Sequence, residues 1–171
     1  MSKPRTPRAT YAQFETPAGP VYAAWSDAGV QFILPAQNSQ EFEIDYEQQF
    51  HRPVARGGEP TKKLRDAIYN GRADQARLDL GDIRPFTRQV LQKTADIPRG
   101  KTASYGDIAK AVGRPNASQA VGRALGANPI PCLVPCHRVI ASDGTLGGYS
   151  LGLDMKATLL EAEGAPFKRK H

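Results

Sequence analysis

Residues 104–128 read "SYGDIAKAVGRPNASQAVGRALGAN" and predict two short helices joined by a tight turn. Ser104 suits the N-cap of the first helix, because Asp107 follows three residues later as in a capping box. In the second helix, apolar residues recur at the spacing of one buried face: Ala117, Val121, Ala124 and Leu125. Gln119 and Arg123 then face outward, which matches a helix-turn-helix. Helical hairpins that bind no DNA are also common, so this stretch alone leaves DNA binding open.

The next segment, "IPCLVPCHRVIASDGTLGGYSLG", holds both cysteines of the chain. Three interpretations compete for Cys132, Cys136 and His137. They form a reactive thiol with a base, or a metal site, or the cysteines are small buried apolar residues. A metal site has only these three ligands, because the remaining histidines, His51 and His171, are distant in sequence. Apolar neighbours favour simple burial for Cys132, whereas the polar residues and glycine loop after Cys136 favour chemistry.

A reactive cysteine needs help, because an unperturbed thiol has a pKa near ~8.5 and is mostly protonated at pH 7. Neighbours on an extended chain point in opposite directions, so direct contact between Cys136 and His137 requires a turn. A bridging water, with a carboxylate behind the imidazole, would complete the arrangement. Glu163 is our candidate for that carboxylate. It lies in the last turn of a predicted helix, "LDMKATLLEAEG" with Asp154 as N-cap, where the helix dipole disfavours an anion.

The first half of the chain predicts a small α/β support domain. "TYAQFETPAGPVYAAWSDAGVQFILPA" alternates apolar and polar residues between turn signals and reads as three strands of a meander. "EFEIDYEQQF" continues the alternation more weakly, and "ARLDL" reads as a further strand. "EPTKKLRDAIYNG" predicts a helix that ends before Gly71. A joint at 81–86 then separates residues 1–82 from 83–171, and Pro85 opens a helix that runs to about Ile97.

Composition describes a globular chain of 171 residues with 40% hydrophobic and 23% charged residues. No apolar run approaches the ~20 residues that a membrane helix needs, and no apolar stretch follows the basic N-terminal arm as a signal peptide would require. We therefore expect no membrane partner. Two cysteines in 171 residues do not form a disulfide framework, so we expect a reducing cytoplasm, and we expect a monomer. Residues 1–82 carry 10 Lys/Arg against 11 Asp/Glu, whereas residues 83–171 carry 13 against 6. A basic second half suggests contact with a polyanion, although it is also compatible with a solvated surface.

"PCHRVI" at 135–140, preceded by "ANPIP" and followed by "GYSLG" and "LLEAEG", resembles the O6-alkylguanine-DNA alkyltransferases, which repair DNA by direct reversal. The likeness is dense from about Pro85 to Pro166 and looser in the first half. It implies an α+β fold, with a small ribonuclease-H-like N-terminal domain and a mainly helical, winged-helix-like DNA-binding domain. It also implies irreversible, single-turnover transfer of an alkyl group from O6-alkylguanine in double-stranded DNA to Cys136, without a cofactor.

The resemblance also implies roles for individual residues. His137 would draw off the thiol proton through a water, and Glu163 would hold the imidazole. Asn128 would order the reactive turn, and Tyr105 would donate a proton to the leaving purine. The pocket for an extruded base would be lined by Leu125, Pro131, Gly147, Gly148, Tyr149 and Ser150.

The second helix of the hairpin would lie in the minor groove, as in the family. Its small residues would let it approach the DNA backbone closely: Ala117, Ala120, Gly122, Ala124 and Gly126. The family usually places an arginine on this helix to fill the gap left by the flipped base, and Gln119 stands there in this chain. Arg123, one turn on, could compensate. Lys101, Arg114 and Arg138 are candidate phosphate contacts, and a structural role for Arg138 is equally open.

Two further expectations follow from absences in the sequence. Some relatives hold a structural zinc in the first half, but residues 1–82 contain no cysteine and one histidine, so we expect no metal. A lesion-binding protein of the alkyltransferase-like type would lack the reactive cysteine, so Cys136 argues against that alternative. A regulator that senses methylation would carry an additional metal-binding or activator domain, and we see none within these 171 residues, so we do not expect that function.

Overall fold

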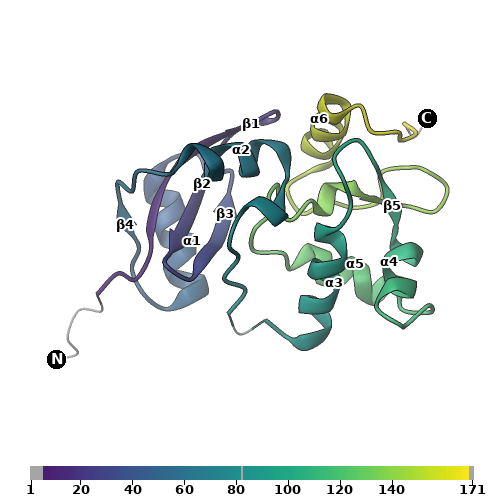
Figure 1. Cartoon of the computed structure of the whole chain (residues 1–171), viewed down its shortest axis with the longest axis horizontal. Coiled ribbons are helices and arrows are strands. Elements are labelled where there is room, and N and C mark those ends of the chain that lie inside the picture. The colour runs from purple at the N-terminus through teal and green to yellow at the C-terminus, as the bar shows by residue number, and fades with distance from the viewer. Residues whose placement is uncertain (1–5, 82, 170–171) are drawn as a thin grey trace.

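The structure is a computed structural model that describes residues 6–81 and 83–169. The start of the expected basic arm (1–5), Asp82 within the expected joint, and His171 lie outside the described residues. Figure 1 shows a small sheet with its helices in the first half of the chain, beside a group of helices formed by the second half. No helix in the described part of the chain is long and apolar enough to span a bilayer.

The predicted meander is confirmed by strands β1 (Thr10–Thr16), β2 (Gly19–Ser26) and β3 (Gly29–Leu34), which pair antiparallel in sequence order. A short strand, β4 (Ala55–Arg56), pairs parallel to β1 and gives the order β3-β2-β1-β4. The three long strands bury side chains on both faces of the sheet, and these side chains belong to two separate core clusters. Both faces of the sheet therefore need cover.

The expectation of a strand at "EFEIDYEQQF" is wrong, because this segment lies within helix α1 (Ser39–Phe50). The Asn38 side chain caps the helix by accepting a hydrogen bond from the backbone N–H of Glu41 at 2.8 Å. Phe42 and Tyr46 are four residues apart and therefore lie on one helix face, where both are fully buried against the aromatic side of the sheet.

Helix α2 (Lys62–Asn70) packs on the other face of the sheet and ends, as predicted, before Gly71, which has the left-handed backbone of a helix C-cap. A 3₁₀ turn, η1 (Ala73–Gln75), follows. The strand predicted at "ARLDL" is wrong, because only an isolated bridge between Leu78 and Val30 forms there. The chain pairs with β3 for one residue and then turns away.

The second half contains α3 (Pro85–Ala95), α4 (Tyr105–Ala111), α5 (Ser118–Gly126) and α6 (Leu153–Glu163). The helical hairpin of α4 and α5 is confirmed, and Ser104 and Asp107 form the predicted capping box. Asp154 is not an N-cap, because α6 already begins at Leu153 and its first turn contains the aspartate.

The core is continuous between the two halves. One cluster of buried side chains extends from the α2 face of the sheet through α3, α4 and α5 to the turn that carries Cys136. This turn is the 3₁₀ helix η2 (Cys136–Arg138), which leads directly into β6 (Val139–Ile140). β6 pairs parallel with β5 (Ala103–Ser104) at the start of α4. The pairing therefore fixes the reactive turn beside α4.

Candidate active site

Short-range hydrogen bonds hold the turn before Cys136. The Asn128 amide donates to the Val134 carbonyl at 3.1 Å, and its oxygen accepts from the Ile130 N–H at 3.0 Å. The Cys136 N–H donates to the Val134 carbonyl at 2.8 Å. Both cysteines are free thiols and both are buried, and the backbone at Cys132 is left-handed, with a φ of 72°. The structure thus places Asn128 where a turn-ordering side chain is expected.

Cys136 lies at the wall of a cavity of about 510 Å³ between α4, α5 and the glycine loop. Four of the residues predicted to form the base pocket line it: Leu125, Gly148, Tyr149 and Ser150. Ser118 and Gly126 also line it, and the sequence had not indicated them as pocket residues. Ser118 and Gly126 lie on the same helix as predicted residues at one- and two-turn spacing, which is the signal that could have found them.

Two residues predicted to line this cavity do not do so. Pro131 is buried in the turn and is not among the residues that line the cavity. Gly147 packs under the ring of Tyr105, where a Cβ would lie 2.8 Å from the phenol oxygen. The tyrosine hydroxyl is anchored on the next residue, since it accepts from the Gly148 N–H at 3.2 Å and lies 3.3 Å from the Gly148 carbonyl.

The imidazole of His137 is buried against Glu163, with 3.0 Å between Nε2 and Oε1. Burial raises the pKa of Glu163, but hydrogen bonds from His137 and Arg138 outweigh it and lower this pKa to about 2. The carboxylate is therefore an acceptor only, so Nε2 carries the proton and Nδ1 is the free base. Burial lowers the pKa of His137, which keeps the ring neutral. Nδ1 makes no hydrogen bond to any other described residue.

The two thiols differ in their surroundings, although burial raises the pKa of both. For Cys132 it does so to about 12, and this thiol stays protonated. For Cys136, the Asn128 amide, the charge of Lys156 and the Tyr149 hydroxyl oppose the effect of burial. The Tyr149 hydroxyl lies close to both sulfurs, yet it makes no hydrogen bond of regular geometry with the described residues. Only Cys136 therefore combines access to the cavity with groups that favour its thiolate.

Comparison with known proteins agrees with this geometry. Residues 85–165 match the family model of the 6-O-methylguanine DNA methyltransferase, DNA binding domain. A methylated-DNA–protein-cysteine methyltransferase of Methanosarcina acetivorans is 36% identical over 160 residues, which cover 91% of this chain and 98% of the relative. This chain belongs to that methyltransferase family.

Further relatives extend the comparison. A Salmonella typhimurium methylated-DNA–protein-cysteine methyltransferase is 52% identical over 80 residues, 47% of each chain. Among solved structures, Mycobacterium tuberculosis OGT in complex with DNA superposes with a TM-score of 0.69 at 31% identity, covering 92% of this chain and 95% of that one. The mixed α/β architecture of this family member, with a small sheet and six α-helices in the described residues, is therefore shared with OGT.

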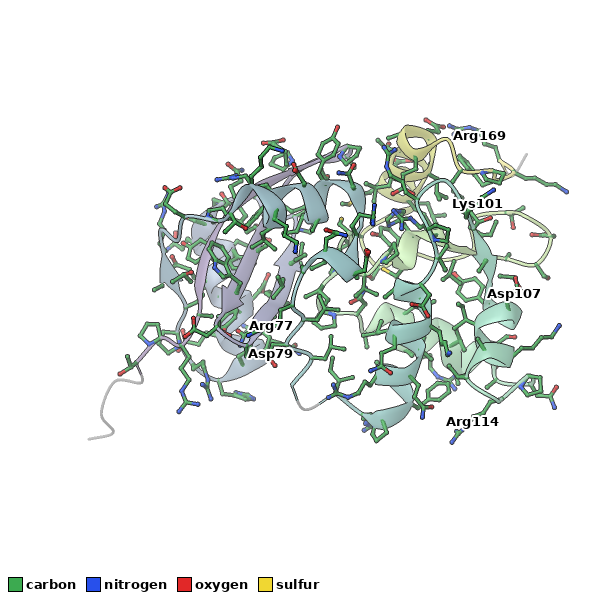
Figure 2. All side chains as sticks on the ribbon, in the orientation of Figure 1. Arg77, Asp79, Lys101, Asp107, Arg114 and Arg169 are labelled. Atoms are coloured by element: carbon green, nitrogen blue, oxygen red, sulfur yellow. The ribbon has the colours of Figure 1, made fainter. Side chains whose placement is uncertain are left out.

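In this methyltransferase, Arg138 is not a phosphate contact. Its side chain is 1% exposed, and it donates two hydrogen bonds to Glu163. Of the two interpretations that the sequence left open, the structural one is correct, because a buried and fully hydrogen-bonded guanidinium cannot reach DNA. In contrast, Lys101 and Arg114 lie at the outer edge of the second half (Figure 2), and on α5 the side chains of Gln119 and Arg123 are exposed.

Sequence reasoning also missed Lys156. Its side chain is fully buried, and the ammonium donates to the backbone carbonyls of Val139 at 2.7 Å, Leu146 at 2.5 Å and Gly148 at 3.0 Å. It lies between the rings of Tyr105 and Tyr149, 5.8 and 5.9 Å from their centroids. The available signal was its position one turn before the buried residues 159 and 160 of α6.

Residues 6–81 and 83–169 contain no group of three histidine, cysteine or acidic side chains arranged to share a metal ion. The alternative of a metal site at Cys132, Cys136 and His137 lacks a fourth donor there. His137 already uses Nε2 toward Glu163, which leaves a single ring nitrogen.

Proposed function

We propose that this protein repairs DNA by transferring the alkyl group of O6-alkylguanine to Cys136, once per molecule. It is a methylated-DNA–protein-cysteine methyltransferase by family, and one observation carries the assignment to a residue. Cys136 opens onto a base-sized cavity, while a neutral His137 with a free ring nitrogen stands next to it in the turn. No cofactor takes part in this proposal, because a sulfur nucleophile and a proton acceptor suffice.

The reaction is an in-line displacement at the alkyl carbon. Nδ1 of His137 accepts the thiol proton through one water, while Glu163 accepts the Nε2 hydrogen bond and stabilises the imidazolium that forms. The sulfur of Cys136 bonds to the alkyl carbon as the bond from that carbon to O6 breaks. Tyr105 provides the proton that neutralises the departing guanine. The thioether is stable, so the protein acts once.

DNA binding in this proposal uses the face of α5. A base inside a duplex cannot reach Cys136, so the lesion must be flipped out at a cost of a few kcal/mol. Gln119 lines the cavity mouth and is placed to enter the gap in the stack, with Arg123 one turn on. Ala117, Ala120 and Gly122 allow close approach to the sugar–phosphate backbone. Exposed Lys101 and Arg114 supply phosphate contacts.

The finer description of the fold also belongs to this proposal. We assign residues 1–82 to a ribonuclease-H-like support domain and residues 83–171 to a winged-helix-like DNA-binding domain. The sheet flanked by helices in the first half and the α4–α5 hairpin in the second support this assignment. We further propose that the protein acts on double-stranded DNA, for which the DNA complex of OGT from M. tuberculosis is a template. We also propose that it acts in the cytoplasm and as a monomer.

The test is an intact-mass measurement after mixing the protein with a duplex that contains O6-methylguanine. We expect a gain of one methyl group per molecule and no further gain with excess DNA. Cys136→Ala should abolish the gain while DNA affinity remains. Cys132→Ala is the matched control, because it removes the other buried thiol of the same turn and should still accept one methyl group.

Two outcomes would contradict the proposal. Tight binding of the lesion duplex without any gain in mass would identify a lesion-binding protein rather than a transferase. A methyl group found on Cys132 in the Cys136→Ala variant would show that the assignment of the acceptor is wrong.

A further inference from the structure

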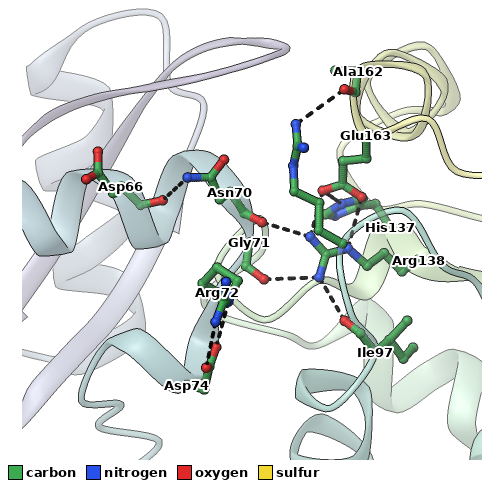
Figure 3. A network of polar contacts seen from close by, with 11 residues as sticks. Asp66, Asn70, Gly71, Arg72, Asp74, Ile97, His137, Arg138, Ala162 and Glu163 are labelled. Atoms are coloured by element: carbon green, nitrogen blue, oxygen red, sulfur yellow. Dashed lines mark hydrogen bonds and ion pairs between the residues drawn. The ribbon is translucent and has the colours of Figure 1, made fainter.

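Arg138 uses every donor that its guanidinium has. An arginine side chain carries five N–H groups in a rigid plane. Nε and one Nη2 hydrogen donate to the carboxylate of Glu163 at 2.9 and 2.7 Å. The other three reach backbone carbonyls, those of Asn70 at 2.9 Å, Gly71 at 3.1 Å and Ile97 at 2.8 Å. Figure 3 shows these bonds converging on the one side chain.

The acceptors come from the C-terminal ends of three helices that are far apart in sequence. Asn70 and Gly71 end α2, Ile97 follows α3, and Glu163 is the last residue of α6. Carbonyls in the last turn of a helix have no partner within the helix, and the negative end of the dipole favours a cation there. The guanidinium of Arg138 therefore joins α2, in the sheet-containing half, to the carboxylate that holds His137.

Gly71 is the point of closest fit in this junction. Its φ is +63°, and a Cβ at this position would lie 2.6 Å from Nη2 of Arg138, 3.2 Å from its Cζ and 3.0 Å from the carbonyl oxygen of Cys132. A side chain of even one carbon cannot fit unless the guanidinium or the reactive turn moves. The end of α2 is thus packed closely against both Arg138 and the segment that carries the two cysteines.

We propose that the C-terminal end of α2, at Asn70 and Gly71, is a positioning element for alkyl transfer, which holds Arg138 and through it sets Glu163 against His137. This inference rests on the proposed function, and it gives the sheet-containing half a direct part in the chemistry. Neither residue touches the cavity, so both act through Arg138.

The arrangement has an electrostatic consequence that a purely structural contact would not have. The positive charge of Arg138 lowers the pKa of both Glu163 and His137. Lys156, on α6, also lowers the pKa of His137, but the three atoms nearest to a Cβ at Gly71 belong to Arg138 and Cys132 and not to Lys156. If the guanidinium moves away, the pair of Glu163 and His137 binds a proton more readily. The acidic limb of the transfer rate should then shift to higher pH.

The experiment compares Gly71→Ala with Gly81→Ala. Both glycines have left-handed backbones, with φ of +63° and +52°, but a Cβ at Gly81 meets only the Asp79 carboxylate at an ordinary 3.9 Å. The control therefore introduces similar backbone strain without touching Arg138. Two rates are measured from pH 5 to 9 by intact mass: methyl transfer from the lesion duplex, and alkylation of Cys136 by iodoacetamide without DNA.

We expect Gly71→Ala to slow methyl transfer by about tenfold or more, because a correctly placed base contributes roughly 10²–10⁴-fold. Its acidic limb should move upward by on the order of one pH unit, the size of shift that a nearby charge produces. Gly81→Ala should keep the wild-type profile in both assays.

Three results would contradict the positioning role of α2 or distinguish its failure from that of the proposed function. A slower rate for Gly71→Ala with an unshifted pH profile would mean that α2 only stabilises the fold. Equal effects of both substitutions would trace the loss to backbone strain. If wild type accepts no methyl group, the proposed function fails, but the iodoacetamide profile still tests whether Gly71 sets the proton affinity around Cys136.

Discussion

Two cations of the site are fully buried, one within the reactive turn and one on α6, and they are stabilised in different ways. Arg138 has a carboxylate partner, Glu163, and five hydrogen bonds. Lys156 has three carbonyls and two aromatic rings, and within the described part of the chain no carboxylate lies at ion-pair distance from it. Burial lowers the pKa of Lys156 to about 8, so its charge can be lost near physiological pH.

The two side chains therefore differ in how their charge depends on pH, since the pKa of Lys156 is lowered to about 8. A guanidinium stays protonated and matches a carboxylate through two parallel hydrogen bonds. An ammonium readily shifts its pKa when buried. Arg138 therefore suits the support of a base, whereas Lys156 holds the loop from Leu146 to Gly148 over the cavity with a charge that responds to pH.

The largest effect is expected from Glu163→Gln, which leaves Arg138 buried without its anion. Removing one partner of a buried ion pair costs about 3–5 kcal/mol, and we expect urea denaturation at pH 7 to show a loss of unfolding free energy at the lower end of that range. Glu161→Gln on the same helix is the control. Glu161 forms an ion pair with Arg169, but both side chains are more than half exposed, so the loss should stay below about 1 kcal/mol. Similar losses of unfolding free energy in both variants would show that the buried ion pair stabilises the fold no more than the exposed one.

A smaller effect is expected from Lys156→Met. This change leaves three carbonyls without a donor but no uncompensated charge, and it removes the cost of burying an ammonium. We expect the unfolding free energy to fall by about 1–2 kcal/mol, less than for Glu163→Gln. Lys63→Met, at an exposed position of α2, should change it by less than about 0.5 kcal/mol. A loss for Lys156→Met as large as that for Glu163→Gln would remove the distinction between the two cations.

The sequence predicted the elements whose signals are local. The structure contains both the capping box of Ser104 and Asp107 and the helix end at Gly71. Each of these signals lies within a few residues of the sequence. Helix α1 was missed because acidic residues between Phe42 and Tyr46 imitate strand alternation, while the four-residue spacing of the aromatic residues indicates a helix.

Residues of the site could be predicted from the sequence only where reactive side chains are close together along the chain or stand at a recognisable position of a helix. Cys136 and His137 are adjacent, and Glu163 stood out as the carboxylate because it lies in the last turn of a predicted helix, where the helix dipole disfavours an anion. The role of Arg138 depends on carbonyls 67 and 68 positions away, which no local pattern reveals. Lys156 was overlooked because a lysine on a helix is usually solvated, and only the packed core shows that its position faces inward.

The smallest expected effect tests whether the charge of Lys156 is conditional. In the unfolded chain this lysine keeps its proton up to its ordinary pKa of 10.5, but in the folded protein it loses it near 8. Between these values the unfolded state binds more protons, so raising the pH favours the folded state at this residue. From pH 8 to pH 9, the unfolding free energy of wild type should therefore rise relative to that of Lys156→Met by about 1 kcal/mol. The comparison is made in a Cys136→Ala background, because the charge of Lys156 lowers the pKa of the Cys136 thiol, which would otherwise titrate differently in the two proteins. The tyrosines and Cys132 are present in both proteins, so the difference then isolates the lysine. A difference that stays constant over this range would mean that the buried ammonium keeps its proton, and then both cations of the site would be permanent.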